Sequence, residues 1–171
     1  MCEVEELILK ALDEYEIVYS VYRHPAKYTI EEKEELDREF GISARHCKNI
    51  FLTDRKKERF FLLVMPFEKT FRTAEVSKEL GSSRLSFASE DLLLEKLHCR
   101  SGSLSSLSLI FDNSGEIGLA IDAELLKCDA LCFHPGINTT TVTISTEDYL
   151  NKFLTKIKHR PTFVTVTCEN A

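Results

Sequence analysis

KNIFLT (residues 48–53) and RFFLLVM (residues 59–65) are two β-rich runs that flank the polar segment DRKKE (residues 54–58). Aliphatic and aromatic runs joined by a short polar segment are typical of β-hairpins, so we predict two paired strands with a basic tip. The tip belongs to one of two basic stretches, residues 45–59 and residues 152–160.

Helix and strand signals continue on both sides of this hairpin. Apolar residues at helical spacing, and capping residues such as Thr29 with Glu32, predict helices at residues 4–15, 29–40, 73–81, 89–97 and from 145 onward. We predict further strands at residues 17–22, 109–111, 117–121, 130–133, 140–144 and 163–167. The strands at 109–111 and 117–121 would form a second hairpin around the turn DNSG (residues 112–115).

The order of these elements indicates the fold class. Helices and hairpins are interspersed without regular βαβ spacing, which favours an α/β (α+β) fold: a mixed, largely antiparallel sheet or partly closed barrel flanked by helices. A chain of 171 residues with 43% hydrophobic residues is long enough for one core. We therefore expect a single domain that spans residues 1–171.

Charge and apolar content narrow the function classes. The formal net charge of −6 argues against sequence-blind binding to nucleic acid, so any RNA contact has to be local. Each basic stretch could supply such a contact, and each alone is equally well explained as solvated surface.

No run approaches the roughly 18 apolar residues of a membrane span, and the acidic N-terminus lacks the basic region of a signal peptide. We expect a cytoplasmic protein without a membrane partner.

The cysteines indicate thiols and not a disulfide framework. Six cysteines, at positions 2, 47, 99, 128, 132 and 168, occur without a secretory signal. Cys128, Cys132 and His134 alone have a spacing that resembles metal ligands, but no CxxC partner is found elsewhere. We favour buried structural cysteines and expect no metal and no cofactor. Cys47 is expected to point away from its neighbour Lys48, into the core.

Motifs of several common enzyme classes are absent. The sequence contains no GxSxG, P-loop, GxGxxG or HExxH pattern. What remains is a Lys-Asn pair at a strand start (residues 48–49), a loop of small residues (101–108) and the loop HPGINT (134–139).

Five segments carry a family resemblance. They are HP (24–25), KNIFL (48–52), RLSFAS (84–89), GSLS (102–105) and FHPGINT (133–139). In this order, over about residues 20–155, they resemble the YbaK/prolyl-tRNA synthetase-associated editing family. The similarity is closest to its free-standing, PrdX-type Ala-tRNA(Pro) deacylases.

The resemblance implies an enzyme that hydrolyses the ester of a mischarged tRNA(Pro), with Ala-tRNA(Pro) as the expected substrate. Such editing in trans corrects errors that a synthetase cannot reject by binding alone. The implied partners are the acceptor end of tRNA(Pro) and possible docking on prolyl-tRNA synthetase; the sequence specifies no oligomeric state. Two alternatives stay open: removal of another small aminoacyl group (Cys, Ser or Thr), and a non-catalytic module that binds aminoacyl-tRNA or an amino acid.

The resemblance also implies the site residues. Lys48, whose ammonium suits oxyanion or phosphate charge, is expected to be catalytic together with Asn49 and His134. On a regular strand Lys48 and Asn49 point to opposite faces, so both line one pocket only if the backbone bulges, and we favour Asn49 as a hydrogen-bonding support of the pocket wall. We expect His134 to hold the aminoacyl end and not to act as a general base. The expected substrate-binding residues are Tyr28, Gly102, Ser103, Ser105, Ser106, Gly136, Asn138 and Thr139.

One position departs from the family pattern. Ser106 stands where the family's Gly-x-x-x-Pro loop has a proline, whose ring fixes φ near about −65°. Serine allows more conformations, so we expect a looser loop and a more permissive pocket. The competing interpretation is that the Ser106 hydroxyl recognises a polar substrate.

Overall fold

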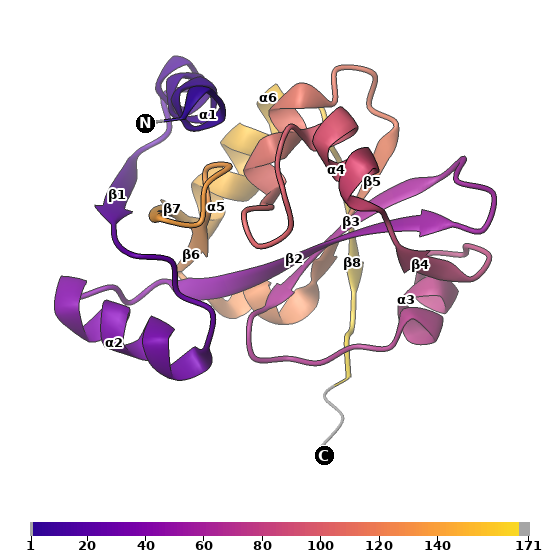
Figure 1. Cartoon of the computed structure of the whole chain (residues 1–171), viewed down its shortest axis with the longest axis horizontal. Coiled ribbons are helices and arrows are strands. Elements are labelled where there is room, and N and C mark those ends of the chain that lie inside the picture. Colours follow the sequence, from indigo (N-terminus) through magenta and orange to yellow (C-terminus); the bar gives the residue numbers. More distant parts are fainter. Residues whose placement is uncertain (1, 168–171) are drawn as a thin grey trace.

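The predicted hairpin forms the middle of a mixed eight-stranded sheet in the computed structural model, which describes residues 2–167 (Figure 1). The strands are β1 (Tyr19–Arg23), β2 (Arg45–Asp54), β3 (Phe60–Pro66), β4 (Leu85–Phe87), β5 (Ile117–Asp122), β6 (Ala130–Phe133), β7 (Thr140–Ser145) and β8 (Pro161–Val164). Their order is β1-β7-β6-β2-β3-β5-β8, with β4 paired to β2 beside this path. The predicted fold class, a mixed sheet flanked by helices, is confirmed.

The helices begin and end largely where capping signals placed them. The α-helices are α1 (Glu3–Glu14), α2 (Ile30–Phe40), α3 (Thr73–Glu79), α4 (Glu90–Leu97), α5 (Thr146–Asp148) and α6 (Leu154–Lys156). Two 3₁₀ helices, η1 (Ser106–Phe111) and η2 (Ala123–Lys127), and a π-helical turn, η3 (Tyr149–Phe153), complete the set. Thr29 and Glu32 form the expected capping box of α2, and Gly41 ends that helix at a φ of 67°. Among residues 2–167, none of these helices combines the length and the apolar character needed to cross a membrane.

The predicted second hairpin is wrong. Residues 109–111 lie in η1, and β5 pairs in parallel with β3 and β8 and not with residues 109–111. Ser105 begins η1 because its side chain accepts a hydrogen bond from the Leu107 amide. A short apolar run has no periodicity long enough to distinguish a strand from a helical turn.

The last strand is shifted relative to the prediction of residues 163–167. β8 ends at Val164 because the following backbone turns to side chains of α3. The Thr165 amide donates to the Glu79 carboxylate at 2.9 Å, and the Thr167 amide donates to Glu75 at 3.1 Å. Cys168 lies outside the described residues.

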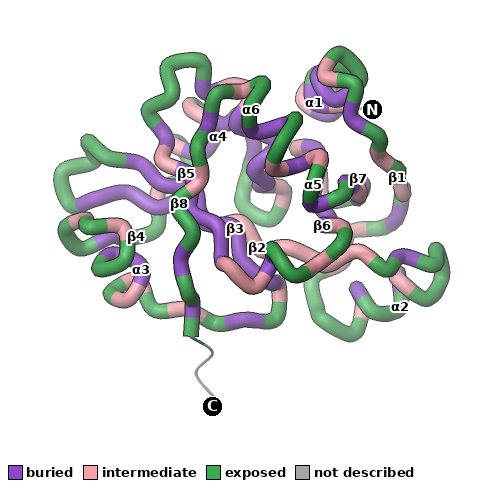
Figure 2. The backbone as a smooth tube through the Cα atoms, turned by 180° about the vertical axis from the view of Figure 1, so that it is seen from behind, coloured by how far each residue is buried: buried purple, intermediate pink, exposed green. Residues whose placement is uncertain are grey.

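Strand alternation builds two cores on opposite faces of the sheet. In β3, Phe60, Leu62 and Val64 face the larger cluster with α1, α4 and η3, whereas the intervening residues face a smaller cluster with α3. Figure 2 shows β3 buried along its length. Because β3 is covered on both faces, it reads as a continuous apolar run and not as an alternating one.

β2 has a gap in the pairing along one edge. β3 occupies one edge in register from Cys47 to Thr53. The other edge pairs with β6 at Arg45 and His46, and then with β4 from Leu52 onward. Residues 47–51 therefore have no strand partner on this edge among the strands that the structure describes.

Gly136 brings the loop between β6 and β7 against α1. Its φ of 76° lies in the left-handed region, and a Cβ atom built there would come 2.4 Å from Cγ1 of Val4. Glycine is needed for both reasons, because it tolerates this conformation and leaves room for the helix.

We predict that Gly136→Ala destabilises the protein more than Gly81→Ala does. Both glycines have positive φ values, which cost an alanine about 1–2 kcal/mol, but nothing lies within 4 Å of a Cβ at Gly81. In the Gly136→Ala variant, the clash with Val4 should lower the free energy of unfolding by about a further 1–3 kcal/mol. Denaturant unfolding of both variants measures the difference, and equal losses would contradict close packing of this loop on α1.

Candidate functional site

A pocket of about 280 Å³ lies at the gap in the pairing of β2. We call it the lysine pocket, because three lysines and no carboxylate line it. Its walls consist of Lys27, Tyr28, Lys33, Cys47, Lys48, Asn49, Phe67, Gly102, Leu104 and His134. In a chain with a formal net charge of −6, this concentrates positive charge in one place.

The structure brings together five of the eleven expected site residues. Tyr28, Lys48, Asn49, Gly102 and His134 line the lysine pocket although they are up to 106 positions apart in the sequence. The other six do not line it: Ser103, Ser105, Ser106, Gly136, Asn138 and Thr139.

Lys48 and Asn49 both line the pocket without a bulge. The register of β2 with β3 is continuous across them, so the expectation that a bulge is required is wrong. The side chains leave opposite faces of the strand, as alternation demands. Both reach the same space because no strand covers this edge of β2 between residues 47 and 51.

Within the part of the chain that the structure describes, the Lys48 ammonium is held by the main chain and not by an ion pair. Nζ donates to the carbonyl oxygen of Lys69 at 2.7 Å and lies 5.8 Å from the centre of the Phe67 ring. Burial lowers the pKa of Lys48, with the carboxylate of Glu68 opposing that shift. An ammonium with one fixed hydrogen bond keeps two N–H donors for a ligand.

Asn49 connects β2 with the start of η1. Its Oδ1 accepts a hydrogen bond from the Ser106 amide at 3.0 Å. Because this bond fixes Oδ1 as the acceptor, the Nδ2 group is the side-chain donor that remains for the pocket. The favoured interpretation of Asn49 as support for the pocket wall agrees with this geometry.

Ser106 is neither loose nor in contact with the pocket. It is fully buried, its amide donates to Asn49, and its Oγ accepts a hydrogen bond from the hydroxyl of Tyr149 at 2.7 Å. Two hydrogen bonds fix the residue, which gives no support to the expected looser loop. The hydroxyl is bonded to the π-helical turn η3, which gives no support to the competing interpretation that it recognises a polar substrate.

His134 is held as a neutral imidazole. Nδ1 lies 2.9 Å from the carbonyl oxygen of Thr140, an acceptor that requires Nδ1 to carry the proton. Burial lowers the pKa of His134 to about 4, and the proximity of Lys33 and His24 acts in the same direction. Nε2 therefore presents a lone pair at the pocket and is a weak base.

Ser105, Asn138 and Gly136 hold neighbouring parts of the structure in place. Ser105 is fully buried and its hydroxyl donates to the carbonyl oxygen of His134. Asn138 donates from Nδ2 to the hydroxyl of Tyr28 at 3.2 Å, which positions that exposed ring at the pocket mouth. Gly136 packs against α1, and its expected contact with substrate stays a prediction.

Ser103 and Thr139 contribute main-chain bonds away from the lysine pocket. The Ser103 amide donates to the carbonyl oxygen of Arg100 at 3.0 Å. The carbonyl oxygen of Thr139 accepts from the His24 amide at 3.0 Å. These bonds shape the neighbouring loops, and both expected substrate contacts stay predictions.

The alternative metal site is not assembled. No three His, Cys, Asp or Glu side chains are grouped for a metal ion within the described range, 2–167. Cys132 is buried near the carbonyl oxygen of Ala44, and burial raises its pKa. Cys47 reaches the pocket wall, but burial raises its pKa well above the usual range, which disfavours a thiolate nucleophile.

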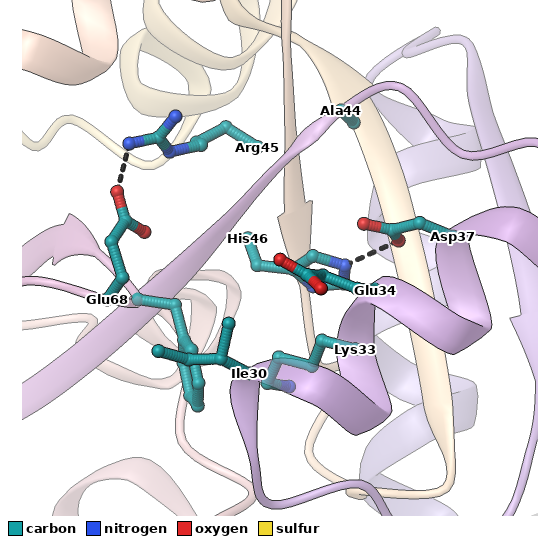
Figure 3. A pocket seen from close by; sticks show the side chains of 9 residues that line it. Ile30, Lys33, Glu34, Asp37, Ala44, Arg45, His46 and Glu68 are labelled. Atoms are coloured by element: carbon teal, nitrogen blue, oxygen red, sulfur yellow. Dashed lines mark hydrogen bonds and ion pairs between the residues drawn. The ribbon is translucent and has the colours of Figure 1, made fainter.

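A second pocket of about 270 Å³ adjoins the lysine pocket and shares Lys33 and Phe67 with it. Figure 3 shows two pairs among its polar side chains: Asp37 faces His46, and Glu68 faces Arg45. The Asp37–His46 distance is 2.7 Å.

On the other side, an apolar pocket of about 180 Å³ shares Asn49, Gly102 and Leu104 with the lysine pocket. The three pockets follow β2.

Several lining residues were not predicted from the sequence: Lys27, Lys33, Phe67 and Leu104. A signal existed for Lys33. It lies three residues from both Ile30 and Leu36, so helical spacing places it on the inner face of α2, where an apolar residue is expected. Phe67 gave no comparable signal, because it directly follows the end of β3.

Comparisons with known proteins place this geometry in a family. A model described as the aminoacyl-tRNA editing domain matches residues 24–152. The prolyl-tRNA editing protein ProX of Acetoanaerobium sticklandii is 32% identical over 85% of this chain and 88% of its own length. Prolyl-tRNA synthetase associated domain-containing protein 1 of Danio rerio is 34% identical over 93% of this chain and 83% of its own length.

A solved structure supports the fold. It was described as a candidate trans-editing enzyme for prolyl tRNA synthetase, and it superposes with a TM-score of 0.70 over 98% of this chain and 99% of its own. Its sequence identity of 12% restricts this likeness to the architecture.

We predict that Ser106→Pro destabilises the protein more than Ser106→Ala. Alanine removes the acceptor of the Tyr149 hydroxyl, which should cost about 1–3 kcal/mol. Proline also removes the amide that donates to Asn49. The Ser106→Pro variant should therefore lose about 1–3 kcal/mol more of its free energy of unfolding than the alanine variant. The difference between the two variants in denaturant unfolding measures the contribution of the Ser106 amide hydrogen bond to stability. A proline variant as stable as the alanine variant would refute that contribution.

We predict that His134 makes the protein less stable at acidic pH. Its pKa of about 4 in the folded state lies below the ordinary histidine value of 6.5, so the unfolded chain takes up the proton first. The resulting stability is fully present above pH 6.5, is lost as pH falls towards 4, and amounts to roughly 3 kcal/mol at about 1.4 kcal/mol per pKa unit.

Thermal unfolding of His134→Asn and the parent between pH 7.5 and pH 4 tests this. Asparagine keeps a donor for the Thr140 carbonyl. Because burial also lowers the pKa of His46, the relevant quantity is the difference between the two proteins. The variant should lose less stability, and identical pH profiles would show that His134 is not the group responsible.

Proposed function

The chain belongs to the family of aminoacyl-tRNA editing domains, and from this premise we propose that it removes a wrongly attached amino acid from tRNA(Pro), with Ala-tRNA(Pro) as substrate. Relatives that cover most of the chain carry the names prolyl-tRNA editing protein and prolyl-tRNA synthetase associated domain-containing protein, which supports this choice of tRNA. The proposal extends to action in trans in the cytoplasm, and to docking on prolyl-tRNA synthetase as a possible mode of delivery. We further propose that residues 1–171 form a single domain.

The observation that carries the proposal is the composition of the lysine pocket. Lys48, Asn49 and His134 come from two distant segments and line one space, next to the backbone of Gly102. The pocket therefore combines an ammonium group, an amide donor and a neutral imidazole acceptor. These are groups that ester hydrolysis can use without a covalent intermediate.

The reaction joins water to the ester. A water oxygen bonds to the carbonyl carbon, and the tetrahedral intermediate then breaks its bond to the ribose oxygen. The ribose oxygen takes up one proton from the water and becomes a hydroxyl group, so the products are the free amino acid and uncharged tRNA. Negative charge develops on the former carbonyl oxygen, and stabilising it is the main requirement of the site.

Each named side chain has a place in this step. The Lys48 ammonium, with two free donors, and Nδ2 of Asn49 offer hydrogen bonds to the developing oxyanion. Nε2 of His134 accepts a hydrogen bond from the α-ammonium group of the aminoacyl end. Its low pKa favours this binding role over a general-base role.

The size of the site favours a small aminoacyl group. The lysine pocket has to accommodate the ester, the α-ammonium group and part of the terminal ribose within about 280 Å³. Leu104 supplies an apolar wall suited to a methyl side chain. Alanine meets these conditions without a polar partner for its side chain.

We predict that Lys48→Ala lowers the rate of Ala-tRNA(Pro) hydrolysis by about a hundredfold or more, the scale seen when one transition-state contact is lost. Lys10→Ala is a suitable control, because Lys10 is an exposed residue of α1. Single-turnover release of labelled alanine measures the rates, and thermal unfolding confirms that both variants are folded. Undiminished hydrolysis by a folded Lys48→Ala protein would remove Lys48 from the mechanism.

The same assay on tRNA(Pro) charged with Ala, Cys, Ser or Thr tests the substrate. Preferential release of alanine is the expected result. Faster release of another amino acid would change the substrate, and tight binding of charged tRNA without any hydrolysis would favour a non-catalytic module.

A further inference from the structure

Lys33 is a buried lysine without an anionic partner. Its exposed fraction is 7%, and its ammonium lies 4.5 Å from the centre of the Phe67 ring. No carboxylate within residues 2–167 forms an ion pair with it, and Asp37, one turn further along α2, is hydrogen-bonded to His46. Burial lowers the pKa of Lys33, and the nearby negative charges offset this only in part. Such a group is expensive to bury, because an aromatic face replaces only part of its hydration.

Lys69 shows how the same protein buries a lysine for structural purposes. Its exposed fraction is also 7%, but its ammonium lies 2.8 Å from Asp122, 2.8 Å from Glu124 and 3.0 Å from the carbonyl oxygen of Val166. These three acceptors satisfy all its donors. The contrast indicates that the donors of Lys33 are kept for a group that is not part of the chain.

The place of Lys33 shows where that group binds. Lys33 and Phe67 line both the lysine pocket and the second pocket, so they form the wall that the two pockets share. Lys48 approaches the same ring, at 5.8 Å. Two ammonium groups therefore flank one aromatic side chain, on a wall that a ligand can reach from either pocket.

The substrate chemistry identifies the ligand class. In an aminoacyl-tRNA the carboxylate of the amino acid is consumed in the ester and its α-amino group is a cation. The phosphodiester groups are then the anions that the substrate can offer near the ester. A phosphodiester has charge and acceptor oxygens that match ammonium donors.

We infer that Lys33 is a phosphate-binding residue, which, beside Lys48 and Phe67, holds a phosphodiester of the acceptor strand at the wall between the two pockets. This inference rests on the proposed function and adds a contact that sets the direction of the substrate. Lys33 and Lys48 attract the phosphate, and the neutral His134 is an acceptor that the same pocket offers to the α-ammonium group.

The inference is tested with Lys33→Met, Lys33→Arg and the exposed control Lys10→Met. Binding of uncharged tRNA(Pro) is measured by fluorescence anisotropy over a range of salt concentrations, and hydrolysis is measured as kcat and KM separately. Lys33→Met should weaken binding about three- to tenfold and reduce the slope of log affinity against log salt by roughly 0.7–0.9, the value for one phosphate contact. Its effect should fall on KM more than on kcat, and Lys33→Arg should retain most of the salt slope.

Stability separates this role from a structural one. Because the Lys33 charge has no partner in the described chain, Lys33→Met should unfold at the same or a higher temperature than the parent. Lys69→Met should unfold at a lower temperature, because it leaves Asp122 buried without its cation. A strongly destabilised Lys33→Met protein with an unchanged salt slope would overturn the inference.

A tRNA without its 3′-terminal CCA locates the contact. Removal of CCA should abolish the difference between parent and Lys33→Met, and a persistent difference would overturn the assignment to the acceptor end. The binding and hydrolysis measurements test the phosphate contact and the proposed function separately. A parent that binds through Lys33 but does not hydrolyse contradicts the proposed function alone, whereas hydrolysis with binding unchanged in Lys33→Met contradicts this inference alone.

Discussion

The gap in strand pairing along β2 is the constraint on which the site depends. β6 pairs as far as His46 and β4 begins at Leu52, so among the described strands the intervening backbone has a strand partner on one edge only. The lysine pocket and the adjoining apolar pocket lie along this gap. A continuous partner strand would fill the space with backbone, and a regular sheet would then separate Lys48 and Asn49 on its two faces. An open edge is usually a liability that a protein covers, and here the loops that cover it also line the pocket.

Buried hydroxyl groups hold those loops in place. Ser105 bonds the carbonyl of His134, and the amide and hydroxyl of Ser106 connect β2 with Tyr149. Tyr149 lies in the π-helical turn η3, and such turns are rare and concentrate at functional sites. The small-residue loop thus uses its polar groups inward, where each unpaired group would be costly, and leaves main chain and longer side chains to face the pocket.

Much of this architecture could be predicted from local sequence signals, because a hairpin and a capped helix are determined by neighbouring residues. KNIFLT with RFFLLVM, and Thr29 with Glu32, are such cases. The strand at residues 109–111 was predicted wrongly because a short apolar run has no decisive period. The family resemblance brought Lys48, Asn49 and His134 to attention, but not what surrounds them. The partners of Ser106 and the isolation of Lys33 depend on contacts between distant segments, which spacing along the chain does not encode.

Burial acts on the two kinds of basic residue in this site with different results. Desolvation lowers the pKa of His134 and of Lys48, because in both the charged form loses its hydration. The imidazole starts from 6.5, and its lowered pKa of about 4 leaves it neutral at physiological pH, whereas the ammonium starts from a much higher ordinary value of 10.5. Burial therefore acts in the same direction on both groups but leaves a neutral acceptor and lysine side chains in one pocket. A ligand that carries an ammonium group at one end and phosphate at the other finds a partner for each end there, without any carboxylate in the pocket wall.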